Sequence, residues 1–528
     1  MNFASWSLRN PIPSILFFAL LTIAGFYGFK SLHIQDLPDI DLPAVNVELT
    51  LPGASPVQLE TEVARKAEDS LATIAGIKHI NTTVIDGLVS MNVQFVLEKN
   101  LSDALLETKD AIDRIRSDLP PNLEEPVISA DRIGSNAIMV YAVSSAGMDE
   151  EELSWFTDDV IGKRILAVDG VGKFERIGGT DREIKIEIDP VKLASLNVTA
   201  ADVSQTLKNV QTEDSGGRSR LDGQEQLIRT ITTASTASEL SQLSVPSQDG
   251  RTVRLEQVAK VLDTHAQRSQ LSLLDGKEVV GFNIYRAKGA DEVTIAENVH
   301  KVLTKLEKEH PEIFLTQVNN TVNYTITQYE GSMSMLYEGA LLAVIVVWFF
   351  LRDWRATLIS ATALPLSIIP TYAVMHWLGY SLNTLTLLAQ AVVVGILVDD
   401  AIVEIENIVR HKRMGKPVFT AVSDAVNEIA LAVIATTFTI VVVFLPTSLM
   451  AGVGGLFFKQ FGWTVVISVL FSLLVARLLT PVMAFRFLKD DAHTHKPDGF
   501  VMKTYITVVR WCLGHGKTHL RLPPFTWC

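Results

Sequence analysis

The stretch AVVVGILVDDAIVEIENIV, Ala391 to Val409, combines the composition of a membrane-spanning helix with two adjacent carboxylates. Asp399 and Asp400 interrupt an apolar run that would otherwise pass for an ordinary span. Each ionised carboxylate at the centre of a bilayer costs about 2.5–3.5 kcal/mol even on the lenient insertion scale. Because the chain carries this cost twice in succession, we expect the two side chains to have a function.

The length of the apolar run places this pair near the middle of a span. The part before it, from Asn383, is about 16 residues long, and continuing to Ile408 restores a full crossing. The alternative is a shorter helix that ends at the water interface. At mid-membrane two adjacent carboxylates cannot both stay ionised cheaply, so we expect them to titrate as one coupled unit. This pattern favours a proton carrier.

Sodium is the rival ligand for the pair, because carboxylates also bind cations. The obvious extra oxygen ligands are Thr436, Thr437 and Thr439 on the next span, so protons are preferred. Glu404 and Glu406 follow one and two turns later. Their position before the basic run RHKR fits the interfacial end of a helix better than a role in carrying protons with the two aspartates.

Six apolar blocks are long enough to cross a bilayer. The first lacks a well-placed small-residue cleavage site, so we predict an uncleaved span rather than a signal peptide. Basic residues gather in alternate short loops, which predicts a cytoplasmic N-terminus and an outward-facing loop of about 300 residues after the first span. Lys30 and Arg477 are exceptions that can snorkel or pair inside the bundle. The blocks start at Pro11 and then cover Ser332–Leu351, Ala356–Leu378, Asn383–Ile408, Ile429–Pro446 and Trp463–Phe487.

The outward loop begins with a strand, helix, strand, strand, helix and extended segment. Ser55 and Pro56 mark the first helix start, Asp86-Gly87 marks the hairpin turn, and the last segment follows Pro126. This order predicts a split βαβ, ferredoxin-like unit. A second unit starts at AIMVYAVSS and is interrupted by residues 179–267. The interruption is either a decorative loop or, as we favour, a contact module for a partner or neighbouring copy.

Composition excludes several classes of function. The 528 residues carry a net charge of −13, which argues against a nucleic-acid partner, and they contain no P-loop pattern. Cys512 and Cys528 are the only cysteines, so the loop has neither a disulfide framework nor a cysteine metal site. The sequence shows no recognisable Ser-His-Asp, zinc-binding or phosphate-binding pattern. His33, His79 and His376 fit surface or interface positions. We expect a protein that is not an enzyme and has no metal or cofactor.

Several segments together resemble the N-terminal half of a resistance-nodulation-division (RND) efflux pump, in the branch that exports hydrophobic and amphiphilic molecules. They are LPDIDLPAVNVELTLPGASP, ILAVDGVGKFERIGG, FLRDWRATLISATALPLSIIP, GILVDDAIVEIENIVRH, FLPTSLMAGVGGLFFKQFGWTVVIS and ARLLTP. The resemblance covers nearly the whole chain. It implies an α+β membrane protein in which a six-helix transmembrane bundle carries periplasmic ferredoxin-like subdomains and an inserted docking subdomain.

The resemblance also implies a mechanism and partners. Asp399 and Asp400 would carry protons, the proton gradient would replace a cofactor, and small amphiphilic substrates would leave the bacterial inner membrane. A homotrimer, a periplasmic adaptor and an outer-membrane channel would complete the pump. Ala137 and Ile177 stand where well-known drug exporters of this family have two pocket-lining phenylalanines, so a narrower or different substrate range is expected.

The implied domain plan leaves the function of the chain open. A complete pump repeats this half, and its relay needs a lysine from the second half, so we expect a truncated half that cannot transport alone. The alternatives are a lipid or protein translocation subunit and a non-transporting scaffold.

The resemblance implies the following domain boundaries: 1–32, cytoplasmic N-terminus and first helix; 33–133, first porter subdomain; 134–178 with 268–331, second porter subdomain; 179–267, docking subdomain; 332–488, helices two to six; and 489–528, cytoplasmic amphipathic segment and truncated tail.

Overall fold

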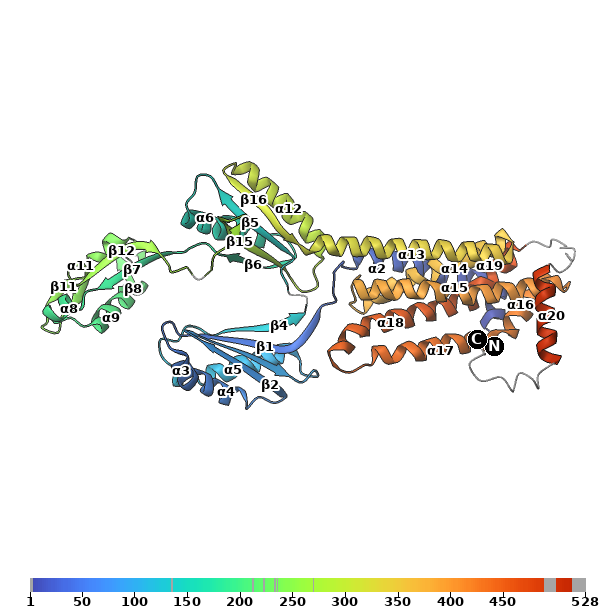
Figure 1. Cartoon of the computed structure of the whole chain (residues 1–528), viewed down its shortest axis with the longest axis horizontal. Coiled ribbons are helices and arrows are strands. Elements are labelled where there is room, and N and C mark those ends of the chain that lie inside the picture. The colour runs from blue at the N-terminus through green and yellow to red at the C-terminus, as the bar shows by residue number, and fades with distance from the viewer. Residues whose placement is uncertain are drawn as a thin grey trace.

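In the computed structural model, a bundle of long helices, two mixed lobes and a small outer segment follow one another along an elongated molecule (Figure 1). The structure describes residues 3–133, 136–210, 213–221, 224–231, 234, 236–268, 270–488 and 500–514. Most of the tail expected at 489–528 therefore lies outside the described residues, apart from α20 (Phe500–Gly514).

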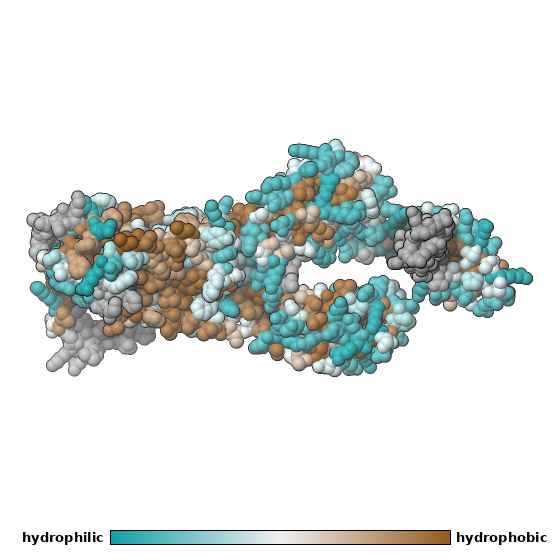
Figure 2. All heavy atoms as spheres, turned by 180° about the vertical axis from the view of Figure 1, so that it is seen from behind, coloured by the Kyte–Doolittle hydropathy of each residue, from teal (hydrophilic) through white to brown (hydrophobic). Residues whose placement is uncertain are grey.

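Six helices of the described chain are long and apolar enough to cross a membrane, as predicted. Their apolar residues form a broad brown surface over the bundle (Figure 2). Two begin earlier than expected, at Thr321 and Gly452, because polar or glycine-rich first turns precede their apolar parts. They are α2 (Pro11–Ser31), α13 (Thr321–Leu351), α14 (Trp354–Trp377), α15 (Thr384–Arg413), α17 (Ala430–Ser448) and α18 (Gly452–Leu474), which continues through the π-helical turn η4 (Val475–Leu479) into α19 (Thr480–Phe487).

Shorter helices lie at one end of the bundle, where the N-terminus also lies (Figure 1). They are α1 (Phe3–Arg9) and α16 (Val418–Glu428). Within the bundle, α2 and α14 pack very closely at two glycines of α2. A Cβ atom on Gly25 would lie 2.2 Å from the Ile369 carbonyl oxygen, and one on Gly28 would lie 2.7 Å from that of Tyr372.

The first lobe has an antiparallel sheet with strand order β2-β3-β1-β4, and its helices connect the strands in the predicted sequence order. Ser55 accepts a hydrogen bond from the Gln58 amide at 3.4 Å, which confirms the predicted helix start. The apolar stripe predicted on this helix, including Leu59 and Val63, is fully buried. The elements are β1 (Ile40–Thr50), α3 (Pro56–Leu59) continuing through η1 (Glu60–Ala64) into α4 (Arg65–Leu71), β2 (Ile77–Ile85), β3 (Leu88–Phe95), α5 (Leu101–Arg114) and β4 (Val127–Ile133).

The second lobe repeats this arrangement with the order β16-β5-β15-β6. The strands correspond one to one with those of the first lobe, but a long insertion separates β6 from β15. The last strand, β16, runs directly into α13, so no loop separates this lobe from the bundle. The elements are β5 (Met139–Ser145), α6 (Glu150–Phe156) continuing through η3 (Thr157–Gly162) into α7 (Lys163–Leu166), β6 (Val171–Ile177), β15 (Val280–Arg286), α12 (Glu292–Glu309) and β16 (Ile313–Asn320).

The insertion lies at the end of the molecule farthest from the bundle (Figure 1). Its strands β7 (Arg182–Ile188) and β12 (Ala259–His265) pair antiparallel and form a neck. Beyond the neck, Leu193, Val203, Leu255 and neighbouring residues form a small separate core. The other elements are α8 (Pro190–Ser195), α9 (Ala200–Val210), β8 (Glu213–Leu221), β9 (Gln224–Ile231), α10 (Ala237–Ser241), β10 (Ser244–Pro246), β11 (Thr252–Arg254) and α11 (Leu255–Val258).

Candidate functional site

The helix α15 carries the two aspartates without a break. Its start is fixed by Asn383, whose side chain accepts hydrogen bonds from the amides of Leu385 and Thr386, both at 3.1 Å. The helix then runs for 30 residues to Arg413, with Asp399 and Asp400 near its midpoint. The local sequence permits this because two acids cost a helix little by propensity, whereas a glycine or proline cluster would end it.

The two aspartates have different surroundings. Asp399 lies on an exposed stripe of α15, whereas Asp400 is half-buried. The Ser472 hydroxyl, on α18, lies 3.4 Å from Asp400 Oδ2 and also donates to the Leu397 carbonyl at 3.2 Å. Neighbours in sequence point about 100° apart on a helix, so adjacent aspartates necessarily face different environments.

Glu404 is fully buried against the neighbouring helices and is not on the exposed face of α15. Its nearest basic group is Arg477, whose Nη1 lies 3.8 Å from Glu404 Oε1. Glu406 is exposed, as expected for its position. The sequence contained a signal for this pair: a glutamate in one apolar span and an arginine in another have opposite charges that favour pairing.

Thr436, Thr437 and Thr439 on α17 bond within their own helix, and the hydroxyl of Thr437 also acts on Asp400. Each donates to a carbonyl of its own helix: Thr436 to Val433 or Ala432, Thr437 to Val433 and Thr439 to Ala435. Among the described residues no group of three or more His, Cys, Asp or Glu side chains is placed to hold a metal ion.

A buried ionic network joins the second lobe to the segment after α2. Arg286, at the end of β15, lies 2.6 Å from Asp39 and 3.0 Å from Glu292, measured from nitrogen to oxygen. Burial raises the pKa of Asp39, but the hydrogen bond and charge of Arg286 outweigh it and bring that pKa below its usual range. For Glu292 burial is the largest effect, and its pKa lies above the usual range despite Arg286. Asp39 is distant in sequence from Arg286 and Glu292, so no local pattern predicted the network.

The same segment, residues 33–41, also contacts the start of α15. Its backbone pairs with the loop before α15 through Leu382 N to His33 O at 2.9 Å and Gln35 N to Leu382 O at 3.2 Å. The Thr384 hydroxyl donates to the Asp36 carbonyl at 3.0 Å. We call residues 33–41 the strap. It bonds to the aspartate-bearing helix on one side and to the second lobe on the other.

An open gap lies between the two lobes (Figure 2). On β1, Asn46 and Glu48 face away from the core of the first lobe, and the Glu48 charge acts on Lys173 of β6. Glu175 accepts a hydrogen bond from the Tyr285 hydroxyl at 2.6 Å and pairs with Lys173 at 2.9 Å. Polar side chains of β1 and β6 thus face this gap, together with the partly exposed ring of Tyr285.

Ala137 and Ile177 do not lie together. Ile177 pairs with Gly281 at one end of β15, whereas Ala137 precedes Ile138, whose amide donates to Ile284 at the other end. The two positions are about 15 Å apart along the sheet, at ~3.3 Å per residue. Their role in substrate binding stays a prediction.

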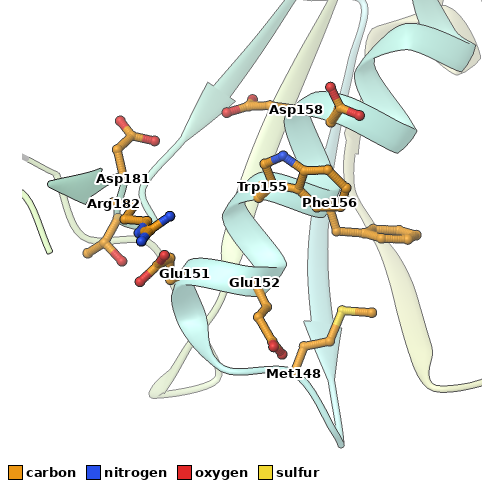
Figure 3. A pocket seen from close by; sticks show the side chains of 10 residues that line it. Met148, Glu151, Glu152, Trp155, Phe156, Asp158, Asp181 and Arg182 are labelled. Carbon is orange, nitrogen blue, oxygen red and sulfur yellow. The ribbon is translucent and has the colours of Figure 1, made fainter. Parts of the chain in front are cut away.

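A pocket of about 680 Å³ lies beside the neck and is lined by acidic side chains, Trp155 and Phe156 (Figure 3). Most of its charges are already paired. Arg176 pairs with Asp158 at 2.8 Å and with Asp181, and Arg182 pairs with Asp263 at 2.6 Å. These ion pairs, together with the left-handed backbone of Gly178 and Gly179, fix the direction of the neck.

Known proteins resemble this chain along almost its entire length. A family model described as AcrB/AcrD/AcrF matches residues 3–520. Multidrug resistance protein MdtC of Pectobacterium atrosepticum is 28% identical over 99% of the chain and 52% of that protein, and MdtC of Escherichia coli O139:H28 is 30% identical over 98% and 51%. The chain thus spans about half the length of the curated relatives it matches. On this match the chain belongs to the AcrB/AcrD/AcrF family of RND transporters.

Proposed function

We propose that the chain is the N-terminal half of a proton-driven exporter of small amphiphilic compounds. The observation that carries this proposal is the placement of Asp399 and Asp400 at the middle of an unbroken apolar helix. Acids inside membrane helices are costly and are retained mainly in ion and proton pathways. The names of the relatives, multidrug resistance proteins, support export of drug-like molecules.

The exposed stripe of α15 supports a partner helix with a basic residue. A helix face that is apolar except for one central acid is poorly suited to lipid and well suited to a helix that brings a counter-charge. In the proposed complete pump this helix belongs to the half that the chain does not cover. This part of the stripe consists of Leu388, Val392, Gly395, Asp399 and Val403.

The lobes suit the periplasmic parts of such a pump. Their common strand order supports two ferredoxin-like porter subdomains, and the insertion supports a docking subdomain that reaches toward an adaptor or an outer-membrane channel. The proposed assembly is a homotrimer in the bacterial inner membrane, with the lobes in the periplasm. Amphiphilic substrates pass the gap between the lobes, and the polar side chains that face this gap suit molecules that carry a charged group.

Efflux assays in cells without their own pumps test this function. The chain is produced with the C-terminal half of a full-length relative, an adaptor and a channel, and accumulation of a fluorescent amphiphile is measured. We expect gradient-dependent export that Asp399→Asn and Asp400→Asn each abolish, while Glu406→Gln, an exposed acid of the same helix, exports normally. Undiminished export by both aspartate variants would refute proton carriage by this pair.

The scaffold alternative gives a different result in the same cells. A non-transporting scaffold would assemble with the other half without reducing accumulation under any condition. We expect the chain without the second half to show no export either, since Asp399 then lacks a counter-charge. Export by the chain alone would contradict the half-pump proposal.

A further inference from the structure

Glu404 is the most deeply buried acid of the proton-carrying helix. Its side chain is fully buried, and neither carboxylate oxygen has a hydrogen-bond partner among the described residues. By contrast, Asp399 and Glu406 are exposed, and Asp400 has a nearby hydroxyl group. A buried carboxylate without a donor is unfavourable as an anion, so such a group usually has a compensating charge or a bound proton.

Arg477 supplies partial compensation. Its guanidinium lies on the π-helical turn η4, and the side chain is 13% exposed. Arg477 Nη1 donates to the Val426 carbonyl at 2.8 Å, whereas its 3.8 Å separation from Glu404 Oε1 is too long for a hydrogen bond. Arg477 is therefore close enough to stabilise an anion electrostatically, but it does not hold Glu404 in a fixed bidentate pair. Both protonation states of Glu404 are compatible with this geometry.

Asp400 is the other charged group that acts on Glu404. The two acids are four residues apart on one helix, so their side chains lie on the same face with Cβ atoms about 5–6 Å apart. This spacing permits proton transfer directly or through one water molecule. The remaining acids and bases on helices packed against α15 are Glu330 and Glu338 on α13, Arg355 and His376 on α14, Asp424 and Glu428 on α16, Lys459 on α18 and Arg486 on α19.

We propose that Glu404 is a third proton-carrying carboxyl, which accepts a proton from Asp400 and passes it toward the basic end of α15, with Arg477 stabilising its anion. This inference rests on the proposed proton carriage by the aspartate pair. In the transfer, the O–H bond of the Asp400 carboxyl breaks, a new O–H bond forms on Glu404, and Asp400 is left as a carboxylate. The step moves the proton about 6 Å along the helix axis, at 1.5 Å per residue.

Infrared titration of the chain in lipid nanodiscs tests the proposal, because protonated carboxyls absorb apart from carboxylates. We expect a band that appears as the pH falls, is lost in Glu404→Gln, persists in Glu406→Gln and returns at a shifted frequency in Glu404→Asp. Arg477→Met should enlarge this band at neutral pH, because the anion loses its neighbouring charge. If Glu404→Gln leaves the spectra unchanged at every pH, Glu404 does not titrate and the proposal is overturned.

The same spectra separate this proposal from the function on which it rests. Bands that disappear in Asp399→Asn or Asp400→Asn report on the aspartate pair alone. If Glu404 titrates while no aspartate band exists, proton carriage by the pair fails, although Glu404 still exchanges protons. If the Glu404 band is unaffected by Asp400→Asn, the two carboxyls are not coupled, and the transfer step is overturned.

Discussion

Arg286 is buried between Asp39 and Glu292, where each charge depends on the others. The side chain of Arg286 is only 3% exposed, so water cannot replace a lost partner. A buried ion pair gives little net stability over apolar residues, but removing one partner leaves an uncompensated charge. The network therefore matters most for fixing the position of the strap, which carries Asp39.

The substitution Arg286→Met tests this dependence. We expect the free energy of unfolding to fall by about 3–5 kcal/mol, because the buried Glu292 and the partly buried Asp39 lose their counter-charge. Denaturant unfolding of the purified chain measures the change. Lys288→Met is the matched control. Lys288 is half-exposed in its pair with Asp41, so this variant should lose at most ~1 kcal/mol of unfolding free energy. Equal losses in the two variants would contradict the argument.

Sequence patterns predicted Asp399 and Asp400 because a charge in an apolar run is a local signal. They could not predict that Glu404 would be buried, since this depends on where α14, α16 and η4 pack against α15. The Arg286 network was missed for the same reason: Asp39 meets Arg286 and Glu292, which come from a distant segment, only in the folded chain. The separation of Ala137 from Ile177 likewise follows from strand register, which the sequence did not define.

At the scale of elements, the helices and strands of the lobes were predictable from periodicity and turn residues. The hairpin at Asp86-Gly87 and the helix start at Ser55 use local chemistry that is visible in the sequence. The three π-helical turns were not predictable, because they arise inside helices whose apolar periodicity continues on both sides. The pairing of α2 with α14 was predictable only in part. The small residues of α2 indicate that another helix packs closely there, but they do not indicate which helix.

Gly25 provides the test for this pair of helices. In Gly25→Leu the side chain would overlap the Ile369 backbone, so α2 must move away from α14. Overpacking of this kind costs about 1–3 kcal/mol or more. Thermal unfolding in lipid nanodiscs measures it, with Gly395→Leu as the control because nothing lies within 4 Å of a Cβ atom there. If the two variants unfold at the same temperature, the close contact does not stabilise the bundle.

At the scale of the whole molecule, the lobes lie at one end of the long apolar helices, and α16 and the N-terminus lie at the other end (Figure 1). The chain order explains this arrangement, because both lobes and the insertion lie in the chain between α2 and α13. The basic residues between α15 and α16 gather at the end opposite the lobes. By the rule that basic short loops stay in the cytoplasm, the lobes should lie outside.

Cysteine labelling in spheroplasts checks this orientation. Cys512 and Cys528 are first replaced by serine, and single cysteines are placed by Ser195→Cys in the insertion and Lys412→Cys near the end of α15. We expect a membrane-impermeant maleimide to label position 195 in intact spheroplasts and position 412 only after permeabilisation. The reverse pattern would place the lobes in the cytoplasm and contradict the proposed direction of export.

The strap has a mechanical consequence. The strap is bonded to Leu382 in the loop before α15, to Thr384 at the start of α15, and to Arg286 of the second lobe. It therefore links the helix mechanically to the lobe. Any axial sliding of α15 by even a fraction of a helical turn must either pull the lobe along or break these bonds. Work done on the helix by charge movement would thus arrive at the lobe as displacement, without any change in the strands themselves.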